Sequence, residues 1–112
     1  MTVYVFNTLT VPIDFDERDE VKIILRRVTA QEARDLMREG FISAVGHEST
    51  ARVLSQILGI DVPYERRTVF MNPGDIGIHF FLKSRIPEGR VLTEEEMKEL
   101  PYWLVQSIVL AP

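Results

Sequence analysis

A short motif at residues 46–50, GHEST, joins an imidazole to residue types that commonly begin helices. Gly46 permits close backbone approach, and Ser49 and Thr50 after His47 carry hydroxyls that can cap a helix or donate to an oxyanion. The unpaired N–H groups of a helix's first turn attract phosphate. An imidazole there can give a proton to a leaving oxygen. The motif indicates a phosphate site with a general acid, or alternatively only an N-cap at Ser49 beside an ordinary loop histidine.

Two further pairs of charged residues could hold a phosphate. Arg85 and Glu88 lie in one loop around Pro87, where the guanidinium can grip a phosphate and the carboxylate can orient a sugar hydroxyl. Arg66 and Arg67 precede an expected strand and could act in the same way. The alternatives are a surface ion pair and a solvated basic pair.

Other polar residues favour a structural interpretation. The acidic residues Asp14, Asp16 and Asp19 lack the glycine turn and final glutamate of a calcium loop, so we expect no metal site. His79 alternates within an expected strand, and we interpret it as a packed or surface residue rather than a ligand. Four neighbouring apolar residues are interpreted as core rather than as a base-stacking platform: Phe70, Met71, Phe80 and Phe81.

Composition predicts one globular domain spanning residues 1–112, since 46% of residues are hydrophobic and 27% are charged. No segment has the pattern of a membrane helix or signal peptide, and we expect the cytoplasm. Without cysteine the chain has no disulfide, thiol nucleophile or Cys-ligated metal. A net charge of -4 argues against coating long nucleic acid, although a few arginines and a helix start can hold a small anionic ligand.

The apolar patterns predict an α/β (α+β) fold, a mixed sheet of about five strands with about three helices packed on it. The expected strands are residues 3–6, 21–28, 68–71, 76–82 and 103–110, and the third and fourth form a hairpin through the turn at 72–75. The expected helices run over residues 30–39, from the GHEST motif to Gly59, and from 93 to 100. Capping boxes begin the first at Thr29 and the last at Thr93.

Three segments together resemble the viral anti-CRISPR ring nucleases of type III CRISPR systems. They are VYVFNTLT, SAVGHESTARVLSQILGI and SRIPEGRVLTEEEM, and their order and spacing cover almost the whole chain. The combination of GHEST with a later R-x-x-E-G-x-x-L-T segment is far more specific than either part alone. The family is also known from archaeal viruses as a domain of unknown function, with relatives in bacterial genomes.

The resemblance implies a two-fold homodimer whose groove binds cyclic tetra-adenylate, the second messenger of type III CRISPR defence. Members cut the ring without a metal or other cofactor, giving linear di-adenylate with a cyclic phosphate end, which silences the defence. The resemblance makes His47 the general acid and Arg85 and Glu88 active-site residues. It also assigns the ligand contacts, which are Asn7, Thr10, Gly46, Ser49, Thr50 and Arg66; Thr10 stands where a relative has serine.

Two other functions remain open. One is a protein that sequesters the messenger, or another cyclic nucleotide, without cutting it. The other is a small viral DNA-binding protein, against which the acidic net charge argues. The sequence also leaves open the viral or cellular origin, the preferred ring size and the identity of any general base.

Overall fold

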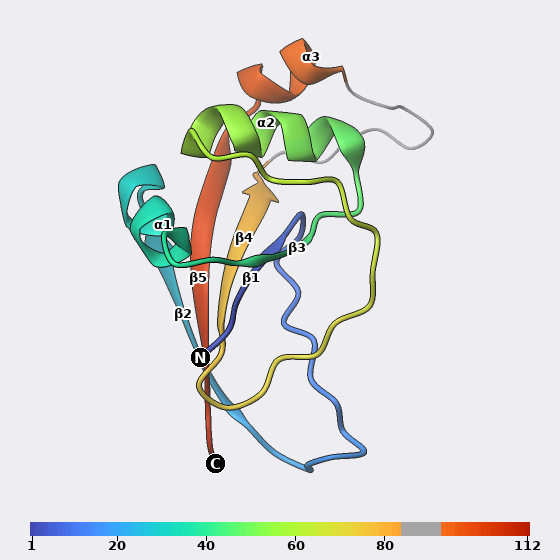
Figure 1. The fold of residues 1–112 in the computed structure, drawn as a ribbon, viewed down its shortest axis with the longest axis vertical. Helices are drawn as coiled ribbons and strands as arrows, with labels where there is room; N and C mark the ends of the chain where they lie inside the picture. The colour runs from blue at the N-terminus through green and yellow to red at the C-terminus, as the bar shows by residue number, and fades with distance from the viewer. Residues whose placement is uncertain (84–92) are drawn as a thin grey trace.

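A five-stranded mixed sheet forms the centre of the protein, as predicted. The computed structural model describes residues 1–83 and 93–112. The elements in chain order are β1 (Val3–Phe6), β2 (Lys22–Val28), α1 (Ala30–Met37), β3 (Ile42–Ala44), α2 (Glu48–Leu58), β4 (Ile76–Leu82), α3 (Glu94–Glu99) and β5 (Tyr102–Leu110). Helices α1 and α2 pack on the sheet, and α3 lies against α2 (Figure 1).

The strand order is β2-β5-β4-β1-β3. Strand β1 runs parallel to both of its neighbours, β3 and β4. Strands β4 and β5 are antiparallel, as are β5 and β2. The parallel and antiparallel halves of the sheet therefore meet at β4.

One predicted strand, residues 68–71, is wrong, and with it the predicted hairpin. Met71 is buried, but its N–H donates to the Pro12 carbonyl 2.9 Å away, so the segment crosses the loop after β1 instead of pairing with β4. The fifth strand is instead β3, whose three residues pair with β1. Of the four apolar residues assigned to the core, Met71 and Phe80 are buried, whereas Phe70 is 47% exposed and Phe81 is half-buried.

The two faces of the sheet are covered differently. Val3 and Val5 pack in one buried cluster with residues of α1 and α2, such as Met37 and Leu54. Phe6, which points to the opposite face because side chains alternate along a strand, packs instead with Met71 and Val109. Helices therefore cover one face, and irregular segments before β2 and β4 cover part of the other.

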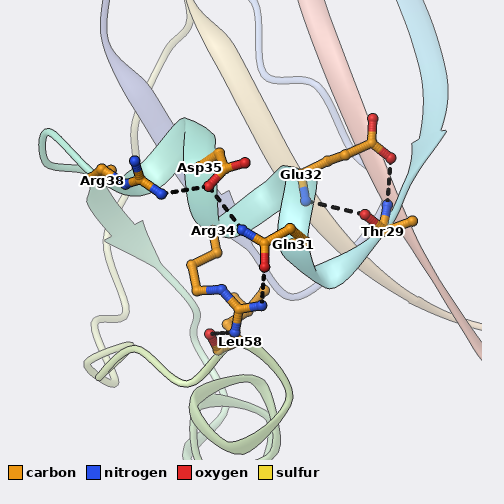
Figure 2. A network of polar contacts seen from close by, with 7 residues as sticks. All are labelled: Thr29, Gln31, Glu32, Arg34, Asp35, Arg38 and Leu58. Atoms are coloured by element: carbon orange, nitrogen blue, oxygen red, sulfur yellow. Dashed lines mark hydrogen bonds and ion pairs between the residues drawn. The ribbon is translucent and has the colours of Figure 1, made fainter.

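Polar contacts fix the start of α1 and its position against α2 (Figure 2). The Thr29 hydroxyl accepts from the Glu32 N–H and the Glu32 carboxylate accepts from the Thr29 N–H, which confirms the predicted capping box. Arg34 Nη1 donates to the Leu58 carbonyl over 2.9 Å, and Gly59 ends α2 with a φ of 68°. The predicted capping box of Thr93 and Glu96 is likewise present at α3.

Within residues 1–83 and 93–112, no helix combines the length and apolar character required to cross a membrane.

Candidate functional site

Three parallel strands end at the same edge of the sheet, where α2 begins. Because β1 is parallel to β3 and β4, the chain leaves all three strands at this edge, at Phe6, Ala44 and Leu82. Figure 1 shows α2 lying across the end of the sheet at which β4 terminates. Ligands of open α/β sheets commonly bind outside the carboxyl ends of the strands. This end of the sheet is therefore where a ligand site is expected.

His47 is the N-cap residue of α2. Its backbone is extended, with φ −128° and ψ 124°, and its carbonyl accepts the first helical bond, from Ala51 over 3.0 Å. Its side chain makes no capping hydrogen bond and is exposed. The interpretation of Ser49 as the N-cap is wrong, because the helix already begins at Glu48. The ring is accessible to a ligand seated on the first turn of α2.

Asn7 ties the loop after β1 to the GHEST motif. Its Oδ1 accepts a hydrogen bond from the Gly46 N–H, 3.1 Å away. Asn7 is the first residue after β1, and Gly46 directly precedes His47 in the chain. The structure therefore brings Asn7 and the motif together, although 39 positions separate Asn7 from Gly46.

Arg66 lies over Gly46. A Cβ atom placed on Gly46 would be 3.5 Å from Arg66 Cγ, which shows how closely the arginine stem approaches the motif. A parallel backbone bridge between Val45 and Tyr64, which includes a 3.0 Å bond from the Glu65 N–H to the Val45 carbonyl, holds the arginine's segment there. The Arg66 side chain is exposed. The stem of an exposed arginine thus lies next to the start of α2.

The two arginines of the 66–67 pair differ in their surroundings. Arg67 forms an ion pair with Glu65, with 3.4 Å between Nη2 and Oε2. The structure shows no corresponding ion pair of Arg66 with any described residue. The sequence pattern does not distinguish the two, but only Arg66 is placed against the motif.

The remaining predicted contacts divide by exposure. Thr10 is exposed and its hydroxyl accepts from the Thr8 hydroxyl over 3.2 Å, so it lies in the same loop as Asn7. Ser49 is half-buried and Thr50 is 6% exposed, which leaves Ser49 as the more accessible hydroxyl of the motif. Arg85 and Glu88 lie outside the described residues.

The other candidates from the sequence lie away from this edge or within the fold. Asp14 Oδ1 accepts from the Asp16 N–H at 2.9 Å, and the described residues contain no group of three or more His, Asp or Glu that could hold a metal. His79 is fully buried, so of the two positions that the sequence left open, packed or on the surface, the structure shows the packed one. Burial lowers the pKa of its imidazole, although its hydrogen bond to the Thr8 backbone opposes that shift.

Sequence reasoning missed the link between His79 and the site. Its Nδ1 lies 2.9 Å from the Thr8 carbonyl, one residue after Asn7. The register that pairs His79 with Phe6, and so brings the ring to Thr8, leaves no local signal in the sequence. The sequence gives one indication of this role, a single histidine within the otherwise apolar strand IGIHFFL.

Comparison with known proteins finds relatives that match almost the whole chain. Residues 3–104 match the family described as STIV B116-like. "Uncharacterized protein 26" of a Sulfolobus islandicus filamentous virus is 36% identical over 110 residues, covering 95% of this chain and 92% of the relative. "Uncharacterized protein ORF117" of Acidianus two-tailed virus is 41% identical over 106 residues, covering 91% and 88%.

A solved structure has the same fold. B116 of Sulfolobus turreted icosahedral virus superposes with a TM-score of 0.71 at 22% sequence identity, covering 96% of this chain and 99% of that one. A bacterial relative, "Uncharacterized protein YddF" of Bacillus subtilis, is 29% identical over 79 residues, which are 68% of this chain and 73% of the relative.

Proposed function

This chain belongs to the STIV B116-like family, and we propose that it is a metal-independent ring nuclease that cleaves cyclic tetra-adenylate and so switches off type III CRISPR signalling. The observation that carries the proposal is the exposed His47 at the start of α2, flanked by the Asn7–Gly46 hydrogen bond and by Arg66. These three elements supply a proton donor, a fixed backbone and a cation. The cytoplasm, where the messenger is made, is the proposed location.

The proposed reaction uses the nucleophile that RNA carries. The ribose 2′-oxygen attacks the adjacent phosphorus, the P–O5′ bond breaks, and a 2′,3′-cyclic phosphate remains. The protonated imidazole of His47 gives its proton to the departing O5′, and the 2′-hydroxyl proton passes to water. The result for a ring cut twice is two linear di-adenylates.

Stabilisation of the phosphate falls to the groups around the imidazole. The first N–H groups of an α-helix have no partner within the helix, so the start of α2 can donate to a phosphate oxygen. The Arg66 guanidinium can approach the same phosphate because its stem already lies over Gly46. We assign Arg85 and Glu88 to the same site from the family resemblance alone.

A two-fold ligand suits a two-fold protein. In a homodimer with one His47 from each subunit, the same surface serves both halves of the ring. We therefore propose that the edge carrying His47 faces its copy across the bound ring. Size-exclusion chromatography with light scattering, with and without the ring, measures this assembly.

The test is incubation of the full chain with cyclic tetra-adenylate in EDTA, with products identified by mass. Linear di-adenylate ending in a cyclic phosphate is expected. A ring that stays intact with saturating enzyme both in EDTA and with added Mg²⁺ would instead favour sequestration without cutting, and would overturn the proposed activity. Cleavage with Mg²⁺ but not in EDTA would overturn its independence of metal.

Two neighbouring arginines provide a matched control. We expect Arg66→Ala to weaken ring binding by about tenfold or more, because a charge-assisted contact to phosphate is lost. Arg67→Ala removes the same charge from a residue already paired with Glu65 and should change affinity less than about threefold. Equal losses in both variants would show only a general effect of net charge.

A further inference from the structure

His79 and Ser107 form a fully buried polar pair on adjacent strands, and both side chains are 0% exposed. His79 Nε2 lies 2.7 Å from Ser107 Oγ, and Nδ1 lies 2.9 Å from the Thr8 carbonyl. Burying an imidazole without hydrogen-bond partners would be strongly unfavourable. Both ring nitrogens are instead satisfied.

The partners fix the direction of each hydrogen bond. A carbonyl oxygen only accepts, so Nδ1 must carry the hydrogen and donate to Thr8. In the neutral ring Nε2 is then an acceptor, and the Ser107 hydroxyl donates to it. The Thr8 carbonyl therefore selects the tautomer, and the Ser107 hydroxyl, which can donate or accept, donates to the remaining ring nitrogen.

The residues around the His79–Ser107 pair pack closely against it. A Cβ on Gly77 would stand 2.4 Å from Ser107 Oγ and 2.6 Å from His79 Nε2, so a glycine is required by close approach. The His79 ring also stacks on Phe6, with centroids 5.0 Å apart and planes 13° from parallel. Phe6 is the residue directly before Asn7.

We propose that His79, anchored in the interior by Ser107 at Nε2, is a positioning residue that sets the loop carrying Asn7. Its anchor, the Thr8 carbonyl, follows Asn7 by one residue, and Asn7 in turn accepts from the N–H of Gly46 beside His47. The chain of contacts runs from the interior to the proposed proton donor. The inference rests on the proposed function for its effect on cleavage, but not for its effect on structure.

Two substitutions separate the two bonds of the imidazole. In His79→Asn the amide nitrogen can occupy the place of Nδ1 and keep the bond to Thr8, while the bond to Ser107 is lost. In His79→Gln the longer amide reaches the place of Nε2 and keeps Ser107, while the bond to Thr8 is lost. Both variants remove the ring that stacks on Phe6, so each controls for the packing loss of the other.

We expect His79→Gln to lower kcat for ring cleavage by about tenfold or more relative to His79→Asn, at matched melting temperatures and similar KM. A role in packing alone would lower both variants equally, in step with stability, and would overturn the proposal. NMR gives the structural readout: the Gly46 amide and Asn7 carboxamide resonances should move in His79→Gln and stay near their wild-type positions in His79→Asn. Unmoved resonances in His79→Gln would also overturn it.

The NMR readout distinguishes failure of this inference from failure of the proposed function. A protein that cuts no ring but shows the resonance shifts would retain the positioning role and lose the nuclease. The wild-type protein supplies a check that needs no variant, since long-range ¹H–¹⁵N spectra should show His79 with its hydrogen on Nδ1. A hydrogen on Nε2 would leave Thr8 without its donor and overturn the inference.

Discussion

The chain has two histidines, and the structure places them in opposite environments. His47 is exposed at the start of a helix, and none of the described residues forms a hydrogen bond with its ring. His79 is fully buried and both of its ring nitrogens are bonded. Proton transfer to a ligand requires an accessible ring, whereas fixing a loop requires a ring with a single protonation state. The two histidines are thus suited to different tasks, His47 to proton transfer and His79 to fixing a loop.

The glycines near the two histidines, Gly46 and Gly77, also differ in the space around them. Gly46 leaves ordinary van der Waals space below the Arg66 stem, with 3.5 Å from its would-be Cβ to the nearest atom. Gly77 faces Ser107 across the strand pair and leaves no space for a methyl group. The motif at the edge of the sheet therefore has space beside its glycine, whereas the interior has none beside Gly77.

The largest expected effect concerns the accessible ring. His47→Ala should lower the rate of ring cleavage by about 10²- to 10⁴-fold, because the general acid is lost, and leave the melting temperature near that of the wild type. Single-turnover assays with labelled ring in EDTA measure the rate, and calorimetry measures stability. Cleavage at the wild-type rate would show that another group protonates the leaving oxygen.

The next effect concerns the interior glycine. Gly77→Ala should reduce the free energy of unfolding by about 1–3 kcal/mol, because its methyl group would overlap the His79–Ser107 pair. Gly46→Ala is the control at the edge, with an expected change within about 0.5 kcal/mol. Urea unfolding of both variants measures the difference. Equal losses would show that the edge and the interior are packed alike.

The buried His79 ring should make the free energy of unfolding depend on pH. Because burial lowers the pKa of His79, the unfolded chain binds more protons than the folded one below the ordinary histidine value of about 6.5. The free energy of unfolding should therefore fall as pH drops below that value, by up to about 1.4 kcal/mol per pH unit, until the folded pKa is reached.

Urea unfolding between about pH 7 and pH 5, above the range where most carboxylates titrate, measures this slope. His79→Asn should flatten it, because the titrating group is removed. His47→Ala should retain it, because His79 is still buried. A slope that survives in His79→Asn would assign the acid sensitivity to other groups.

The elements that sequence patterns predict well are those whose signal is local. The capping box at Thr29 and the glycine at position 59 mark helix boundaries through bonds to near neighbours. The GHEST motif likewise indicates the start of α2, because residue types that favour a helix's first turn lie directly before its apolar face. Strand β3 was missed because three residues, Ile-Ser-Ala, are too few to show an alternation.

The errors and omissions depend on contacts between distant segments. Residues 68–71 have the β-branched and aromatic content of a strand beside a strong turn, but the backbone of Met71 pairs with Pro12. The placement of Arg66 over Gly46 depends on the isolated bridge between Val45 and Tyr64, and that of His79 beside Thr8 depends on the register of β4 against β1. Periodicity within a segment does not encode contacts with distant segments. The GHEST motif could therefore indicate candidate site residues, but not the residues that hold them in place.

The smallest expected effect tests how the loop of Thr8 is held. The Thr8 carbonyl is bound from the interior by His79, whereas its hydroxyl donates to the exposed Thr10 hydroxyl over 3.2 Å. Water competes for the second bond, so Thr10→Val should change the free energy of unfolding by no more than about 0.5 kcal/mol. Thr10→Ser keeps the hydroxyl and is the matched control for ring affinity, which Thr10→Val should weaken by less than about tenfold. A decrease in the free energy of unfolding above about 1 kcal/mol in Thr10→Val would mean that the exposed bond between the Thr8 and Thr10 hydroxyls holds the loop. That result would contradict the positioning role proposed for His79.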